Sequence, residues 1–347
     1  MKRTHLFTLV SMAVLAMLLL SACGTETAPT ATPATSGSTG NAGSSASGGL
    51  PKLAKKDKYK VGFSQTVSDN PWRLAETQSM KDEAAKRGWE IVVTDAGGSA
   101  AKQVADVDSL IAQKVDAIFL APQEEKPLVP AVMKAKAAGI PVILLDRTVD
   151  QTQAQGGRDY ITFIGSDFVE EGQRVAEWLI KKTNGQAKII ELEGTTGSSP
   201  ANDRKKGFDD AIKSQSGMQI LASQTGQCNR DKGREVMATL LQAHPDVTVV
   251  YAHNDEMAIG AIAALEAAGK KPGQDVTVVS VDGEKDGLQA IIDGKLGATC
   301  ECSPRFGPKA FDTLVAYANG ETIPPQIINP DNFFDATNAK DNIANSY

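Results

Sequence analysis

The chain has 347 residues, of which 41% are hydrophobic and 22% charged, and its formal net charge is −6. This composition is that of an ordinary globular protein, and the length corresponds to about two domains. The acidic balance argues against nucleic acid as a main partner, because binding to phosphates requires a basic surface.

Residues 1–22 are predicted to be an export signal rather than part of the fold. Two basic residues precede an apolar run from Leu6 to Leu20, which is too short to span a membrane comfortably. The segment ends in Leu-Ser-Ala-Cys, which resembles the lipobox of bacterial lipoproteins. We therefore expect Cys23 to be lipidated and to anchor the protein to the bacterial membrane, outside the cytoplasm. A plain signal peptide with an incidental cysteine is the alternative.

The segment 23–56 is expected to be a tether between this anchor and the folded part. Its first half consists almost entirely of Gly, Ser, Thr, Ala and Pro. Such a composition forms no apolar face, so no core can offset the entropy lost on ordering.

From residue 58 onward, short apolar runs alternate with amphipathic helical patterns. The runs are apolar on both faces and rich in Val and Ile, which is typical of parallel strands covered by helices. Ten strands are predicted, at residues 59–63, 90–95, 116–121, 141–146, 160–165, 187–194, 218–223, 247–252, 276–282 and 297–302. This β-α-β rhythm indicates an α/β fold with doubly wound parallel sheets, and ten strands indicate two sheets.

Polar residues recur where these strands end. In open α/β sheets the ligand crevice lies at the carboxyl ends of the strands, so these residues are candidate ligand contacts. They are Asn70, Trp72, Arg73, Glu76, Asp146, Arg147, Thr196, Arg204, Asn254, Asp282 and Glu301.

Each candidate also has a purely structural interpretation. Asn254 or Asp282 could cap the following helix, and Asp146 with Arg147 could form a local ion pair. Trp72 could be packed at a helix start. The recurrence of the same chemistry at several strand ends that the fold brings to one edge favours a binding site.

Carboxylates, guanidinium groups and amides together suit a neutral polyhydroxyl ligand. Each sugar hydroxyl both donates and accepts, a carboxylate accepts, a guanidinium group donates and an amide does both. An indole covers the C–H face of a sugar ring.

The motifs VGFSQ, NPWR, DAIFLAP, PVILLDR, DRKKGF, VVYAHNDEMAIGA and SVDG occur in this order. In this combination the chain resembles the sugar-binding proteins of ABC transporters, in the ribose and galactofuranose branch of the periplasmic binding proteins. The resemblance covers residues 58–345.

The resemblance implies two lobes joined by three crossovers near residues 165, 303 and 327. The N-terminal lobe would comprise 57–164 with 304–327, and the C-terminal lobe 165–303 with 328–347. The lobes would close on a monosaccharide, and a permease would recognise the closed form. The protein is expected to be a monomer without a cofactor or metal.

The resemblance also implies roles for single residues. Trp72 would stack on the sugar, with Asn70, Arg73 and Glu76 beside it. Asp146 and Arg147 would clamp ring hydroxyls from the first lobe. The second lobe would contribute Arg204, Asn254 and Asp282. Where ribose-binding relatives have a second aromatic residue after the first strand, this chain has Arg73, which favours a hexose, in furanose form, over ribose.

Cysteines replace cleft residues of the family at positions 228 and 302. A disulfide between Cys228 and Cys302 could brace the second lobe, and unpaired, partly buried thiols are the alternative. Cys300 and Cys302 are not expected to pair with each other, since residues two apart on a strand are at the limit of disulfide reach.

Three functions are alternatives to sugar transport. A repressor built on the same two lobes would need a DNA-binding headpiece, where this chain has a signal and a tether. A sugar hydrolase would need a catalytic pair of carboxyl groups, and no G-x-S-x-G or H-E-x-x-H motif is present. A chemosensory sugar receptor remains the main alternative to a transport protein.

Overall fold

The computed structural model describes residues 49–347. The expected signal peptide, Cys23 and most of the tether lie outside these residues. Residues 49–56, which the sequence assigns to the tether, contact the first lobe. Pro51 accepts a hydrogen bond through its carbonyl from the hydroxyl of Tyr317 at 2.6 Å, and Leu53 packs against the first hydrophobic core.

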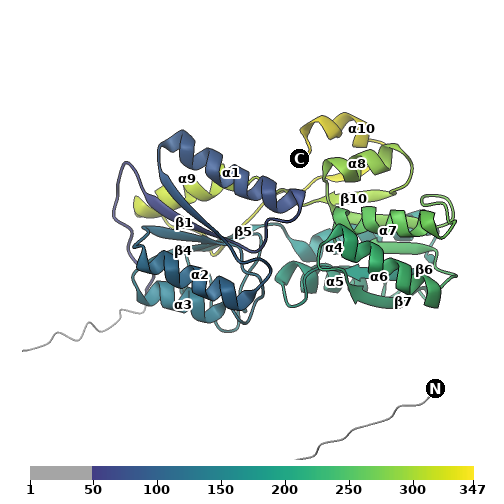
Figure 1. Ribbon diagram of the computed structural model, residues 1–347, viewed down its shortest axis with the longest axis horizontal. Helices are drawn as coiled ribbons and strands as arrows, with labels where there is room; N and C mark the ends of the chain where they lie inside the picture. The colour runs from purple at the N-terminus through teal and green to yellow at the C-terminus, as the bar shows by residue number, and fades with distance from the viewer. Residues whose placement is uncertain (1–48) are drawn as a thin grey trace, which may run out of the picture. The chain divides into compact units, whose positions relative to one another are not determined.

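Two six-stranded sheets form the described part of the chain (Figure 1). The first has the order β11-β5-β4-β3-β1-β2, and the second β12-β10-β9-β8-β6-β7. All pairings are parallel except that of β12 with β10. The strands are β1 (Lys60–Gln65), β2 (Glu90–Asp95), β3 (Ala117–Leu120), β4 (Val142–Leu145), β5 (Thr162–Gly165), β6 (Gln186–Glu193), β7 (Gly217–Thr225), β8 (Val249–Ala252), β9 (Thr277–Asp282), β10 (Ala298–Glu301), β11 (Gln326–Ile328) and β12 (Phe333–Asp335).

Helices follow most strands. They are α1 (Pro71–Arg87), α2 (Ala100–Ala112), α3 (Val129–Ala137), α4 (Phe168–Thr183), α5 (Ser199–Ile212), α6 (Arg230–Ala243), α7 (Asp255–Ala267), α8 (Lys285–Ile292), α9 (Gly307–Ala318) and α10 (Ala339–Asn342), followed by a short 3₁₀ helix, η1 (Ile343–Asn345). The doubly wound α/β fold expected from the sequence is confirmed. None of the described helices is long and apolar enough to span a bilayer.

Helices cover both faces of each sheet. In the first lobe, α1 and α9 lie on one face and α2 and α3 on the other (Figure 1). In the second sheet, neighbouring residues of a strand belong to different cores: Ile189 lies in one core and Ile190 in the other. Because successive side chains of a strand point to opposite faces, both faces are buried, which explains why these strands are apolar throughout.

Two short strands were not expected from the sequence. β11 pairs with β5 in the first sheet, and β12 pairs with β10 in the second. Each has three residues in a stretch rich in Asn and Pro, and this length and composition give little strand signal. The chain thus passes between the lobes after β5, after β10 and after β11. The first sheet reaches Gly165 and Ile328, one residue beyond the expected lobe boundaries.

Candidate functional site

A cavity of about 310 Å³ lies between the two lobes, at the carboxyl ends of the strands. Eight of the eleven candidate residues line it. They are Asn70, Trp72, Arg73, Asp146, Arg147, Arg204, Asn254 and Asp282.

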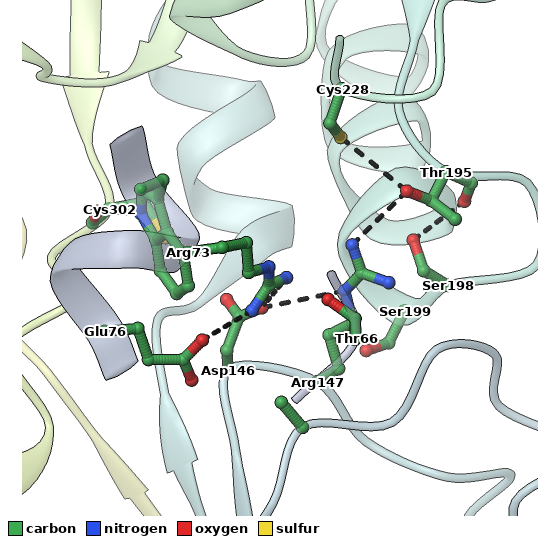
Figure 2. Close-up of polar contacts among 12 residues, drawn as sticks. Thr66, Arg73, Glu76, Asp146, Arg147, Thr195, Ser198, Ser199, Cys228 and Cys302 are labelled. Atoms are coloured by element: carbon green, nitrogen blue, oxygen red, sulfur yellow. Dashed lines mark hydrogen bonds and ion pairs between the residues drawn. The ribbon is translucent and has the colours of Figure 1, made fainter. Parts of the chain in front are cut away.

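Arg73 links two carboxylates of the first lobe (Figure 2). It donates through Nη1 to Oε2 of Glu76 at 2.8 Å and through Nη2 to Oδ2 of Asp146 at 2.6 Å. Gln65 also donates to Oε2 of Glu76, at 2.8 Å. Burial raises the pKa of Glu76 to about 7, although the positive charge of Arg73 opposes this shift. The guanidinium group is therefore held in place by two carboxylates of its own lobe.

Arg147 extends from the first lobe to the second (Figure 2). Its Nη1 donates to the backbone carbonyl of Gln123 at 2.9 Å, and its Nη2 donates to the hydroxyl of Thr195 at 3.3 Å. Burial lowers the pKa of Arg147 to about 10, and the positive charge of Arg73 acts in the same direction. Arg147 therefore remains a cation at neutral pH.

Arg204 has the corresponding central position in the second lobe. Its Nε donates to Oε2 of Glu171 at 2.7 Å, its Nη1 donates to the carbonyl of His253 at 2.6 Å, and its Nη2 lies 3.5 Å from Oδ1 of Asp282. Burial raises the pKa of Asp282 well above its usual value, while Arg204 opposes the shift. Each lobe thus presents an arginine fixed by buried carboxylates.

The two cleft aspartates share an unusual backbone conformation. Asp146 follows β4 with φ 60°, and Asp282 ends β9 with φ 129°. Positive φ is uncommon for residues other than glycine, and such strained positions concentrate at functional sites. The observation favours a functional role for Asp282 over helix capping, and for Asp146 over a purely local ion pair with Arg147.

Trp72 is more buried than the sequence suggested, with only 5% of its surface exposed. Its indole Nε1 donates to the carbonyl of Cys302 at 2.7 Å, and the guanidinium carbon of Arg73 lies 4.5 Å from the ring centroid. Because the N–H group is already bonded and Arg73 covers the ring, little of the indole remains for a ligand.

The cleft asparagines do cap helices, as the structural interpretation of Asn254 required. Asn70 accepts from the backbone N–H of Arg73 at 2.9 Å, and Asn254 accepts from that of Met257 at 3.0 Å. Both also line the cavity. The NH₂ groups donate to Oδ1 of Asp69 at 3.1 Å and to the carbonyl of Cys228 at 3.4 Å. Capping and binding are compatible, because each NH₂ group has a second N–H.

Three expected residues do not line the cavity. Glu76 lies behind Arg73, fully buried. Thr196 is exposed, and its neighbour Thr195 lines the cavity instead. Glu301 accepts from the backbone N–H of Asn332 at 3.0 Å. Since side chains alternate along a strand, Glu301 points away from the cavity that Cys302 lines.

Of the two alternatives for Cys228 and Cys302, the structure has the unpaired thiols: all three cysteines of residues 49–347 are free. The sulfur of Cys228 lies 3.9 Å from Oγ1 of Thr195, whereas that of Cys302 lies 3.6 Å from Oγ of Ser166. The two thiols therefore have different neighbours, although both residues line the cavity.

Sequence reasoning missed several residues of the cleft wall. Besides Thr195, they include Asp69, Gln123, Ser198, Gln227, Asn229 and Lys232. Gln123 lies three residues beyond β3, so the strand-end rule could have found it. Lys232 lies in the first turn of α6 and Asn229 caps that helix, whereas the remaining residues lie in loops whose conformation the sequence pattern does not determine.

The lobes contact each other across the cleft. The backbone N–H of Thr148 donates to Oγ of Ser199 at 2.9 Å, and that of Glu125 donates to the carbonyl of Gly197 at 2.9 Å. Nδ2 of Asn202 donates to Oε2 of Glu125 at 2.7 Å. The cavity is thus enclosed by both lobes. Within residues 49–347, no group of His, Cys, Asp or Glu is arranged to hold a metal ion.

Comparison with known proteins gives consistent matches. The family model of the periplasmic binding protein domain matches residues 61–322. The galactofuranose-binding protein of Escherichia coli K12 is 41% identical over 285 residues, which cover 81% of this chain and 89% of that protein.

Two similar proteins have been solved with a furanose sugar bound. The arabinose transporter component of Shewanella sp. ANA-3, bound to L-arabinofuranose, is 40% identical with a TM-score of 0.79, and covers 82% of this chain and 95% of its own. A protein of Mycobacterium smegmatis in complex with β-D-fucofuranose is 42% identical with a TM-score of 0.79, covering 83% and 94%.

Proposed function

The chain belongs to the sugar-binding periplasmic binding proteins of the ribose and galactofuranose type, and we propose that it captures a hexose in its furanose form for an ABC importer. The observation that carries this proposal is the pair of fixed arginine–aspartate groups, Arg73 with Asp146 and Arg204 with Asp282, on opposite walls of one cavity.

The size of the cavity supports a small ligand. Ligand pockets generally range from about 300 to 1,000 Å³, and the present volume of about 310 Å³ lies at the lower end. The wall chemistry supports a neutral ligand rich in hydroxyl groups, because both guanidinium donors and carboxylate acceptors line the cavity.

The furanose form is supported by the relatives and by Arg73. The relatives in the preceding comparison are galactofuranose-binding or were solved with arabinofuranose or fucofuranose. These sugars share one ring configuration and differ in the side chain outside the ring. Arg73 supplies a guanidinium group for a further hydroxyl, where a second aromatic residue would cover only C–H bonds.

Delivery to a permease completes the proposal. The export signal and the lipidation of Cys23 would hold the protein at the outer side of the cytoplasmic membrane. The two lobes would close around the sugar, and the permease would recognise the surface of this closed, sugar-bound form.

The test is a thermal-shift screen of the purified protein against D-galactose, D-fucose, L-arabinose, D-fructose and D-ribose, followed by calorimetry of the sugars that raise the melting temperature. A ligand that binds only the folded state stabilises it by mass action. Binding of galactose, fucose or arabinose more tightly than ribose is expected. If none of the five sugars shifts the melting temperature at millimolar concentration, the proposal is wrong.

A further inference from the structure

The backbone of Gln123, a residue that lines the cleft, is held in a fixed position. Its backbone N–H donates to Oε1 of Gln103 at 2.7 Å, and its carbonyl accepts from Nη1 of Arg147 at 2.9 Å. Gln103 is itself fully buried and donates to the carbonyl of Ala121 at 2.7 Å. The backbone of Gln123 is therefore held from both sides.

The side-chain amide of Gln123, in contrast, has no partner. Neither of its two polar atoms forms a hydrogen bond within residues 49–347, and Oε1 is covered from solvent without a donor. The residue is 7% exposed and lines the cavity. A buried amide without partners is unfavourable unless something else supplies them.

The other amides of the cleft differ from it. Gln227 is exposed, and its Nε2 donates to Oγ1 of Thr196 at 3.5 Å. The side-chain oxygens of three asparagines already accept from backbone N–H groups at helix starts. They are Asn70, Asn229 and Asn254. One lone pair of each oxygen is thereby used, so these amides have less accepting capacity left for a ligand than the side chain of Gln123, and the arginines can only donate.

Buried carboxylate and amide acceptors for hydroxyl protons are few in the cleft wall, since the carboxylate of Asp69 is exposed. Asp146 and Asp282 supply carboxylates, but both are also engaged with arginines. The amide of Gln123 is a neutral group that can accept from one hydroxyl and donate to another.

We propose that the side-chain amide of Gln123 hydrogen-bonds a hydroxyl of the bound sugar and thereby determines which sugars the cleft accepts. This inference rests on the proposed sugar-binding function. A sugar that lacks the hydroxyl leaves the amide unpaired in the closed cleft, and a site built around such a bond rejects the analogue strongly.

The experiment compares wild type with Gln123→Met, which keeps the length of the side chain and removes its hydrogen bonds. The affinities of both proteins are measured by calorimetry for D-galactose and for its singly deoxygenated analogues. The substitution is expected to weaken galactose binding about tenfold. For the analogue that lacks the hydroxyl contacted by Gln123, the same substitution is expected to change the affinity less than about twofold, because the bond is already missing.

Gln78→Met is the matched control. Gln78 is an exposed glutamine of the same lobe that donates to Asp82 at 2.6 Å, and its substitution is expected to leave all affinities unchanged. If Gln123→Met lowers the melting temperature enough to obscure binding, Gln123→Ala replaces it, since the smaller side chain requires no space.

An unchanged galactose affinity in the Gln123 variant, or an equal loss for every analogue, overturns the inference while the proposed function stands. The absence of binding to wild type by any of these sugars is a different result, because it removes the proposed function and this inference together.

Discussion

The indole N–H of Trp72, at the start of α1, donates to the carbonyl of Cys302, in the crossover after β10, at 2.7 Å. This bond ties the first wall of the cleft to a segment that joins the lobes. The same carbonyl accepts from the hydroxyl of Tyr347 at 3.3 Å. Three parts of the chain that are far apart in the sequence therefore meet at one backbone oxygen.

Trp72→Phe is expected to destabilise the protein by about 1 kcal/mol, the usual net value of a buried hydrogen bond. The ring contact with Phe306 is kept, and Tyr347 still bonds the carbonyl, so the loss is limited. Sugar affinity is also expected to fall, because the crossover is less well fixed against the cleft wall. Urea unfolding and calorimetry measure the two effects. Trp178→Phe loses a comparable bond to Asp335 at 3.1 Å, and an equal fall in its affinity would contradict this prediction.

Asp146→Asn is expected to weaken sugar binding at least tenfold, or about 1.4 kcal/mol. The change removes the negative charge that lies 2.6 Å from Arg73 and 3.6 Å from Arg147. Asparagine tolerates the positive φ of this position, so the fold is retained. Calorimetry with the sugar identified by the screen measures the loss. Asp82→Asn, on the exposed face of α1, serves as the control, and an unaltered affinity of the Asp146 variant would show that this wall does not contact the sugar.

Ser199→Ala is expected to weaken binding about fivefold, which corresponds to about 1 kcal/mol. Oγ of Ser199 accepts from the backbone N–H of Thr148 across the cleft at 2.9 Å, and the bond exists only when the lobes meet. Most of the effect is therefore expected in faster release of the sugar, observed by stopped-flow fluorescence. Ser214→Ala, at an exposed position of the second lobe, should change neither rate. A slower association with unaltered release would refute the closure argument.

Arg204→Met is expected to destabilise the second lobe by about 3 kcal/mol and to abolish sugar binding. The change leaves Glu171 and Asp282 buried without their cation, and breaking a buried ion pair in this way generally costs about 3–5 kcal/mol. Urea unfolding measures the loss. Lys206→Met removes an exposed pair with Asp210 on the same helix and should cost less than about 0.5 kcal/mol. Similar losses for the two variants would be inconsistent with this description of Arg204.

Asp331→Asn is expected to flatten the dependence of stability on pH. Burial raises the pKa of Asp331 to about 7, and the negative charge of Glu171 acts in the same direction. The folded protein therefore holds a proton that the unfolded chain loses at about pH 4. Stability from this group is present below about pH 4 and is lost as the pH rises to about 7.

The measurement for Asp331→Asn is the melting temperature from pH 4 to pH 8, compared with wild type and with the exposed control Asp341→Asn. The Asp331 variant should gain melting temperature relative to wild type as the pH rises through this range. A constant difference between the two proteins would show that Asp331 does not titrate as described.

The sequence allowed the fold and most of the cleft to be predicted because both depend on simple periodic rules. Strands that are apolar on both faces require covering helices, and parallel strands bring their carboxyl ends to one edge. Asp146, Arg147 and Asp282 follow directly from these rules. Gln123 also follows a strand end, but the charged residues at the other strand ends give a stronger signal in the sequence than a single glutamine.

The predicted cavity residues were wrong where a shift of one position along the chain decides which side chain faces the cavity. Thr195 lines the cavity and Thr196 does not, because the loop after β6 turns between them. Glu301 and Cys302 point to opposite sides, because successive side chains of an extended chain alternate between its two faces. Whether Cys228 pairs with Cys302 depends on a distance between two loops, which no sequence pattern contains, so the sequence left both alternatives open.

The asparagine caps of the cleft have a consequence for how this protein can change. Asn70, Asn229 and Asn254 each hold a helix start with the amide oxygen and border the cavity. A substitution at any of them alters helix stability and ligand contact together, so new sugar preferences are hard to select there. The side chains of Gln123 and Cys228 border the cavity but cap no helix. Variation in sugar preference should therefore accumulate at these two positions while the capping residues stay constant.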